Sequence, residues 1–141
     1  TLRIEGSARK IPVYADPRRM EQVMSNLISN AIKHSDEGGD VVVSFGVRKK
    51  SVITRVLDSG ERIPAEHIHR IFERFYRVDK SRSREKGGTG LGLAIVKHIL
   101  EGHNSKAEVE SEPGKGSIFS FKLPRANSNR DERRGASQNH E

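Results

Sequence analysis

Two pairs of short apolar segments, each pair joined by a tight turn, constrain the fold more than any other feature of this sequence. The first pair, VVVSFGVRK and SVITRVLD, occupies residues 41–49 and 51–58 and is joined near the two lysines 49–50. The second, KAEVESE and SIFSFKLP, occupies residues 106–112 and 117–124 around PGKG. Apolar runs of this length bounded by turn residues are typical of β-hairpins. The sequence therefore predicts two hairpins, and residues 1–6 and 10–15 are expected to add two short strands.

Three amphipathic helices are predicted between and around the hairpins. In the first, at 17–34, Asp16 is a suitable N-cap and Pro17 suits the first helical position. Its apolar residues recur at helical spacing on one face: Met20, Val23, Met24, Leu27, Ile28 and Ala31. The helix predicted at 65–78 is expected to face inward with Ile68, Ile71, Phe72 and Phe75. The third, beginning near Leu91, has an expected core side of Leu91, Ala94, Ile95 and Ile99.

These elements predict an α+β fold. The expected architecture is a two-layer α/β sandwich: a mixed, mostly antiparallel sheet with about three helices on one face. The 141 residues suffice for one domain. We place this domain at residues 1–124. Residues 125–141 contain no apolar residue other than alanine and are predicted to be disordered.

Composition excludes several classes of function. The chain has no cysteine, so neither disulfides nor thiolate metal sites are possible. It has no apolar run near 18 residues and no signal peptide, and it starts with Thr, as expected of a fragment of a longer protein. The net charge is +7, but the basic residues are spread along the chain and the only aromatics are five Phe and two Tyr. A basic surface around a phosphate ligand is favoured over nucleic-acid binding.

Four glycines lie within six positions at the start of the third predicted helix, in GGTGLG at residues 87–92. A Walker P-loop is excluded because no Lys-Ser or Lys-Thr follows. A dinucleotide fingerprint is excluded because its third glycine would fall on Leu93. A glycine-led helix start still lets backbone N–H groups approach an anion, and the helix dipole adds partial positive charge. The preceding loop is basic, with Arg77, Lys80, Arg82, Arg84 and Lys86. An anion site is predicted, with a plain helix cap as the alternative.

Two further polar features accompany the glycines. On the helix at 17–34, Asn26, Asn30 and Lys33 lie at i, i+4 and i+7 in one stripe. An amide oxygen can bind Mg²⁺, which takes few protein ligands together with phosphate oxygens and water. Asp58 follows an apolar strand and precedes a glycine turn, where a carboxylate can accept a hydrogen bond from an exocyclic amine such as that of adenine. The alternatives are a solvated helix edge and an Asx-turn.

In this order, the motifs resemble the ATP-binding catalytic domain of bacterial sensor histidine kinases. The resemblance covers about residues 8 to 124. NLISNAIKHS resembles the N box, DSGERIP the first glycine box, IFERFYRVD the F box, GGTGLGLAIVK the second glycine box and SEPGKGSIFSFKLP the closing hairpin. The wider GHKL group includes gyrase, the ninety-kilodalton heat-shock chaperones and mismatch-repair ATPases, and the resemblance implies its Bergerat fold. The F box indicates the phosphate-sensor type of histidine kinase.

The resemblance implies roles for individual residues, with ATP and Mg²⁺ as the bound cofactors. Asn30 would be the Mg²⁺ ligand, and Lys33 and His34 would face the triphosphate. Asp58 would accept the adenine amine beside Gly60. Phe72, Phe75, Tyr76 and Arg77 would anchor a mobile lid at about 79–88. The implied catalytic residues are Asn26, Asn30, Lys33 and Arg77. The implied nucleotide-binding residues are Asn30, Lys33, His34, Asp58, Gly60, Arg62, Ile63, Tyr76, Gly88, Thr89, Gly90, Leu91, Gly92 and Leu93.

The implied function is donation of the γ-phosphoryl group of Mg–ATP to a histidine on a separate dimerisation domain of the same protein. None of the six histidines here lies in an acceptor context. A response regulator receiver domain would be a further partner. The full-length protein is expected to be a homodimer, with this fragment in the cytoplasmic part of a membrane-anchored sensor and itself contacting neither membrane nor nucleic acid. Hydrolytic relatives carry a glutamate where this chain has Asn26, and an amide cannot act as a general base, so slow hydrolysis is predicted.

The sequence departs from the family pattern at two places. Arg62 replaces the second glycine of the first glycine box, and Asn104–Ser105 replace a Gly-Gly pair. Arginine costs about 1–2 kcal/mol if the position requires a positive φ. Asparagine tolerates the left-handed region better. Two alternatives to the kinase domain are a degenerate regulatory module of the same fold, which Arg62 favours, and a hydrolytic ATPase.

Overall fold

The computed structural model describes residues 2–5, 11–36, 38–61, 63–76 and 90–126. In this part of the chain the strands are β1 (Leu2–Glu5), β2 (Val41–Val47), β3 (Ser51–Leu57), β4 (Glu108–Glu112) and β5 (Gly116–Pro124). The helices are α1 (Pro17–His34), α2 (Ala65–Ile68) and α4 (Gly92–Gly102).

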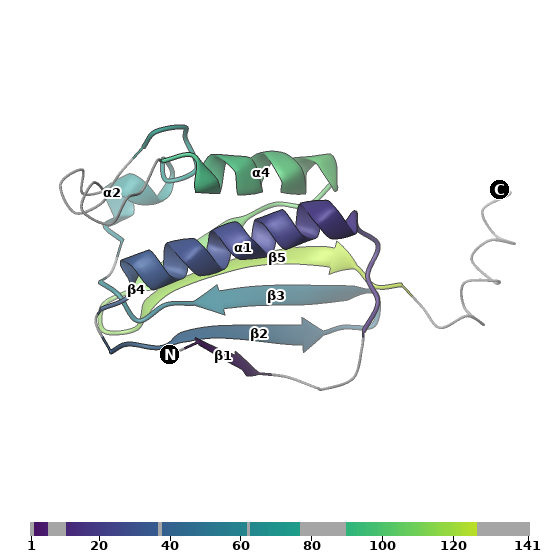
Figure 1. Ribbon diagram of the computed structural model, residues 1–141, viewed down its shortest axis with the longest axis horizontal. Coiled ribbons are helices and arrows are strands. Elements are labelled where there is room, and N and C mark those ends of the chain that lie inside the picture. The colour runs from purple at the N-terminus through teal and green to yellow at the C-terminus, as the bar shows by residue number, and fades with distance from the viewer. Residues whose placement is uncertain (1, 6–10, 37, 62, 77–89, 127–141) are drawn as a thin grey trace, which may run out of the picture.

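The strands form one five-stranded mixed sheet in the order β1-β2-β3-β5-β4. β1 runs parallel to β2, whereas β2–β3, β3–β5 and β4–β5 are antiparallel. Both predicted hairpins are present. Helices α1 and α4 pack side by side over one face of the sheet (Figure 1). The predicted α+β two-layer architecture is therefore confirmed.

Helix α1 begins where the sequence predicts. The side chain of Asp16 caps it, with Oδ1 accepting hydrogen bonds from the backbone N–H groups of Arg18 (3.0 Å) and Arg19 (3.3 Å). The predicted apolar face packs into the core, with Met20, Met24 and Ile28 at its margin and Val23, Leu27 and Ala31 buried. Buried residues of β2, β3, β5 and α4 complete this core. Local capping and helical periodicity thus suffice to place this helix.

The prediction of a strand at residues 10–15 is wrong. In the described part of this stretch, Val13 forms a single antiparallel bridge with Arg125. The N–H of Tyr14 donates to Pro124 (2.9 Å), and the N–H of Ala126 donates to Pro12 (2.9 Å). Pro12 has no N–H to donate, which limits pairing here. The same contacts bury Ala126, so the packed chain continues two residues past 124, and the rest of the predicted tail, 127–141, lies outside the described residues.

The helix predicted at 65–78 is much shorter, because α2 ends at Ile68. From there to Tyr76, hydrogen bonds connect residues three apart, including the bond from the Glu73 N–H to the Arg70 carbonyl (2.9 Å), so the chain forms successive turns. Ile71 is buried as predicted, with Ile68 and Phe72 beside the core. Phe75 was expected inside but is 67% exposed, with φ at 64°. This left-handed residue turns the chain, and its N–H donates to the Gly90 carbonyl (2.7 Å).

Helix α4 buries a different set of residues from the one predicted. Ile99 is buried as expected, whereas Leu91, Ala94 and Ile95 are only half-buried. The other buried residues of α4 are Val96 and Leu100. This helix packs against α1, and its buried residues share one core cluster with those of the sheet. A single-face pattern in the sequence does not reveal a second packing partner.

The end of α4 shows how the chain accommodates Asn104. This residue has φ at 56°, in the left-handed region, and its side chain is exposed. Asparagine tolerates this conformation better than most residues, so replacement of a glycine here is mild, as expected.

Among the described residues, no helix combines the length and apolar character needed to span a membrane.

His103 connects the end of α4 to the start of α1. Its Nδ1 lies 2.9 Å from the carbonyl of Ile99, and its Nε2 accepts a hydrogen bond from the N–H of Asp16 (3.0 Å). We predict that His103→Ala lowers the free energy of unfolding by about 1–2 kcal/mol, because two hydrogen bonds worth about 1 kcal/mol each are lost. Urea denaturation measures the change. His98→Ala, at an exposed position of the same helix, is the matched control, and equal stability of the two variants would contradict the prediction.

Candidate functional site

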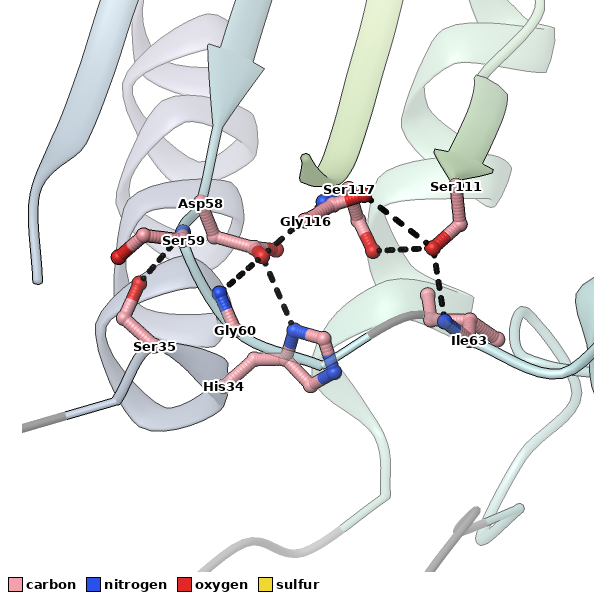
Figure 2. A network of polar contacts seen from close by, with 9 residues as sticks. All are labelled: His34, Ser35, Asp58, Ser59, Gly60, Ile63, Ser111, Gly116 and Ser117. Carbon is pink, nitrogen blue, oxygen red and sulfur yellow. Dashed lines mark hydrogen bonds and ion pairs between the residues drawn. The ribbon is translucent and has the colours of Figure 1, made fainter. Parts of the chain in front are cut away.

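Asp58 lies at the centre of a polar network where β3 ends (Figure 2). Its side chain is fully buried. Oδ1 accepts hydrogen bonds from the backbone N–H groups of Gly60 (3.0 Å) and Ser117 (3.1 Å). Oδ2 is buried and has no hydrogen-bond partner among the described residues. Because a buried polar atom without a partner costs about 1–3 kcal/mol, Oδ2 is a strong candidate acceptor for a ligand donor.

The pairing of β3 with β5 brings Ser117 to Asp58. The N–H of Asp58 donates to the Ser117 carbonyl (2.9 Å), while the N–H of Ser117 donates to the Asp58 carboxylate. Ser117 Oγ also lies 3.0 Å from Ser111 Oγ, which accepts a hydrogen bond from the N–H of Ile63 (2.7 Å). The carboxylate is thus connected to the buried residue Ile63 through two serines.

Sequence reasoning missed Ser111 and Ser117. The available signal is that Ser117 directly follows the glycine turn of the second hairpin. That position becomes informative only once β5 is known to lie beside β3, because the register then places Ile118 opposite Leu57, the residue before Asp58. The order of the strands, which joins the two hairpins, could not be read from local periodicity.

Two glycines allow the chain to close around Asp58. A Cβ at Gly60 would lie 1.9 Å from the His34 carbonyl oxygen and 2.8 Å from His34 Nδ1. A Cβ at Gly116 would lie 2.1 Å from the Asp58 carbonyl oxygen, and this residue has φ at 74°. Any side chain at either position would collide with backbone. The absence of a side chain at Gly60 and Gly116 therefore lets both backbones approach Asp58 and the end of α1.

The C-terminus of α1 packs against the same network. The Ser35 hydroxyl accepts a hydrogen bond from the N–H of Ser59 (3.2 Å). His34 Nδ1 lies 3.1 Å from Asp58 Oδ1, close enough for an ion pair, although the N–H direction is not aligned for a hydrogen bond. The resemblance implied that His34 faces a triphosphate together with Lys33. In the structure its ring lies beside the Asp58 carboxylate (Figure 2).

The polar stripe of α1 lies beside the start of α4. The amide of Asn26 donates a hydrogen bond to the Gly92 carbonyl at 3.4 Å. A Cβ on Gly92 would make ordinary van der Waals contact with Cβ and Cγ of Asn26, at 3.9 Å from each. Asn30 and Lys33 follow on the next turns of α1, half-buried and exposed respectively. The fold thus places the amide stripe next to the glycine-led helix start.

Gly90, just before α4, has a backbone geometry that a side chain would prevent. Gly90 has φ at 79°, and a Cβ there would lie 2.7 Å from the Phe75 Cα. Leu91 is the N-cap residue of α4 and provides no side-chain cap. Backbone N–H groups at a helix start carry partial positive charge and suit an anion. Leu93, in the first turn, is half-buried and packs beside the core.

Tyr76 belongs to a separate cluster at the end of the described segment 63–76. Its hydroxyl pairs with His67 Nδ1, and the Arg70 guanidinium lies 4.6 Å from the centre of its ring. Arg70 Nε donates to Glu73 at 2.8 Å, and this hydrogen bond lowers the pKa of the exposed Glu73 carboxyl. Arg62, Arg77, Gly88, Thr89 and the predicted lid at about 79–88 lie outside the described residues.

The polar residues of this site fit a magnesium ion that is held mainly by the oxygen atoms of a bound ligand. Among the described residues there is no group of three or more His, Cys, Asp or Glu side chains that could hold a metal ion. Mg²⁺ does not need such a group, because it usually binds through one or two protein oxygens together with phosphate oxygens and water. The half-buried Asn30 amide, on the stripe beside α4, can supply one such oxygen.

Comparison with known proteins agrees with this geometry. Residues 15–127 match the family model described as histidine kinase-, DNA gyrase B-, and HSP90-like ATPase. The chain is 43% identical over 118 residues to the sensor histidine kinase WalK of Bacillus subtilis, covering 82% of this chain and 19% of that protein. It is 46% identical over 112 residues to the sensor-like histidine kinase SenX3 of Mycolicibacterium smegmatis, covering 79% and 29%. The chain therefore spans less than a third of either relative.

A solved structure supports the same assignment. The structure of full-length ShkA in complex with AMPPNP superposes with a TM-score of 0.76 and 30% sequence identity, covering 90% of this chain and 26% of that one. The family match extends over most of the chain, from the residue before the Asp16 cap to just beyond β5. The chain belongs to the family of histidine kinase-, DNA gyrase B- and HSP90-like ATPases, and its relatives there are sensor histidine kinases.

Proposed function

We propose that this chain binds Mg–ATP and donates its γ-phosphoryl group to a histidine on a separate dimerisation domain of the same protein. The observation that carries the proposal is the buried Asp58 carboxylate. Backbone N–H groups hold its Oδ1, while Oδ2 has no partner among the described residues. A fixed acceptor of this kind suits the exocyclic amine of adenine.

The phosphate end of the proposed site lies along α1 and the start of α4. Asn30 would hold Mg²⁺ through its amide oxygen, and Asn26 and Lys33 would lie near the phosphates. The glycine-led start of α4 would direct backbone N–H groups at them. We extend the proposal, from the family resemblance alone, to Arg62, Arg77, Gly88 and Thr89. Mg²⁺ bound here would neutralise phosphate charge.

The proposed reaction is phosphoryl transfer, in which positioning and charge neutralisation dominate. A P–O bond of ATP breaks, a P–N bond to the acceptor histidine forms, ADP leaves and the imidazole loses a proton. Asn26 donates to the Gly92 carbonyl, and an amide cannot activate water as a general base, so transfer to water should be slow. The proposed partners are the dimerisation domain and a response regulator, in a homodimeric sensor with this domain in the cytoplasm.

The test combines the chain with Mg–ATP and a candidate dimerisation domain supplied in trans. We predict acid-labile phosphohistidine on that domain and little release of inorganic phosphate in its absence. Asn30→Ala should abolish the Mg²⁺ dependence of ATP binding and lower transfer at least about tenfold, the loss expected for a positioning or metal contact. Ser29→Ala, at an exposed position of the same helix, is the matched control.

Three outcomes would contradict the proposal at different levels. A folded chain with no saturable binding at millimolar ATP would contradict nucleotide binding and favour the degenerate regulatory module. Binding without transfer to any dimerisation domain of a matching sensor would contradict the kinase function. Appreciable ATP turnover by the chain alone would favour a hydrolytic ATPase and contradict the argument from Asn26.

A further inference from the structure

We propose that the outward face of α1 binds a second copy of this chain, with the two α1 helices packed antiparallel across a two-fold axis level with Leu27. The contact lies on this domain itself and does not rest on the proposed nucleotide binding. Three features of the described residues carry it: an apolar groove on α1, an uncovered apolar sheet edge beside it, and a self-complementary order of charges.

The outward face of α1 is apolar at its centre. Val23, Leu27 and Ala31 are buried on the inner face, and Asn26 faces α4 through its hydrogen bond to Gly92. An open groove of about 350 Å³ lies on the remaining side, lined by Ser25, Ile28, Ser29, Ile32 and Lys33. Ile32 is 56% exposed although it is a large apolar residue. Two small serines beside two isoleucines allow a second helix to approach this face closely.

The apolar surface continues from α1 onto the edge of the sheet. Helix α1 contacts β3 and β2, whereas β1 lies at the edge beyond them (Figure 1). Leu2 and Ile4 of β1 lie opposite the core residues Val41 and Val43 of β2, so they point to the face that bears the helices. The exposed apolar residues on this side of β1 and β2 are Leu2, Ile4, Phe45 and Val47. An exposed apolar surface of this kind is typical of a protein–protein contact.

The order of charges along α1 selects a second copy as the occupant. Arg18 and Asp36 lie nine residues before and after Leu27, and Glu21 and Lys33 lie six residues before and after it. Antiparallel packing about an axis at Leu27 places Arg18 opposite Asp36 of the second copy. It likewise places Glu21 opposite Lys33, and the two-fold symmetry forms each pair twice. Parallel packing would instead place like charges opposite each other.

The centre of the same arrangement is sterically suitable. Ser25 and Ser29 lie two residues before and after Leu27, so each serine lies opposite the other type in the second copy. The two Ile28 side chains meet near the axis. These small and apolar side chains allow the separation of about 8–10 Å that is usual between packed helices.

The expected dimer is weak. Two 18-residue helices and a sheet edge make a contact smaller than a standard interface, so we expect a dissociation constant on the order of 10–100 μM. Each chain carries a net charge of +7, which opposes association. At about 0.15 M salt, exposed charges more than about 8 Å apart are largely screened, so this repulsion is reduced more than the attraction of pairs in contact.

The first test is sedimentation equilibrium of the full chain between about 10 μM and about 1 mM, a range that brackets this dissociation constant. We expect a monomer–dimer equilibrium in wild type. Ile32→Asp places two charges in the contact and should raise the dissociation constant at least about tenfold, because buried unpaired charges are costly. His98→Asp adds the same group at an exposed position of α4 and should leave the equilibrium unchanged.

The second test reverses charges within one chain. Arg18→Glu and Asp36→Arg each turn two attractive pairs into repulsive ones, so each should weaken the dimer about tenfold. The double variant restores opposite charges and should return to within about threefold of wild type. Arg19→Glu is the matched control, because Arg19 is exposed but points to another side of α1. If Asp36→Arg disturbs the fold, Glu21→Lys combined with Lys33→Glu provides the same comparison.

Three results would overturn the inference. A folded wild-type chain that stays monomeric throughout this range would show that a second copy does not cover the face. A dimer that Ile32→Asp leaves intact would use a different surface. A double reversal no stronger than its single variants would show that the helices do not pack antiparallel about Leu27.

Discussion

Asp58→Asn is expected to lower ATP affinity about 100-fold, near the upper limit for a hydrogen bond to a charged group. The asparagine can keep an oxygen at the Oδ1 position, so the hydrogen bonds from Gly60 and Ser117 remain. It replaces Oδ2, which has no partner among the described residues, by an NH₂ donor. The new amide NH₂ and the 6-amino group of adenine are both donors, so they cannot form a hydrogen bond with each other. The measurement is an ATP titration by calorimetry, together with thermal unfolding.

The same substitution should change the choice of base. An amide donor can pair with a 6-oxo group, so affinity for inosine triphosphate should rise relative to ATP. Glu108→Gln removes a carboxylate charge at an exposed position of β4 and is the charge-matched control. Unchanged ATP affinity in a folded Asp58→Asn variant would show that this carboxylate does not recognise the nucleotide.

Gly60→Ala is expected to disturb both the fold and the site. The new methyl group would lie 1.9 Å from the backbone oxygen of His34, so the loop after β3 or the end of α1 must move. Overpacking of this kind costs about 1–3 kcal/mol of unfolding free energy. The movement also displaces the Gly60 N–H from Asp58 Oδ1, so ATP affinity should fall at least about tenfold, as for loss of a charge-assisted hydrogen bond. Urea denaturation and ATP titration measure the two effects.

Gly102→Ala is the matched control, because a Cβ at this last residue of α4 would meet nothing within 4 Å. Alanine favours helix over glycine by up to about 1 kcal/mol, so this variant should be at least as stable as wild type. If the two variants were equally stable and bound ATP equally well, the close packing of Gly60 on His34 would have no energetic weight.

The sequence predicted well those elements that depend on local patterns. The cap at Asp16, the apolar face of α1 and both hairpins follow from interactions between residues near in sequence, and the structure confirms them. The family resemblance, rather than a local pattern, implied that Asn26 and the glycine-led helix start belong to the phosphate end of one site, and the fold brings them together in the Asn26–Gly92 contact. The nucleotide-binding roles of these residues remain proposals.

The predictions that failed needed information from distant residues. Phe75 looks helical and apolar, but its N–H bonds to Gly90 and it lies outside the core in a left-handed turn. Residues 10–15 look like a strand, but their partner is the chain around Arg125. In α4, Val96 and Leu100 are buried although the single-face pattern did not include them, and α1 packs against this helix.

The sequence by itself determined the helix and hairpins, the type of fold and the identity of the polar groups, because short-range capping, turns and periodicity encode them. Only the tertiary structure decided how these groups meet. Pairing of β3 with β5 brings Ser117 to Asp58, and close packing of Gly60 brings the end of α1 and the His34 ring to the same carboxylate oxygen. Contacts between residues far apart in the chain fix the orientation of Asp58, and no local pattern records them.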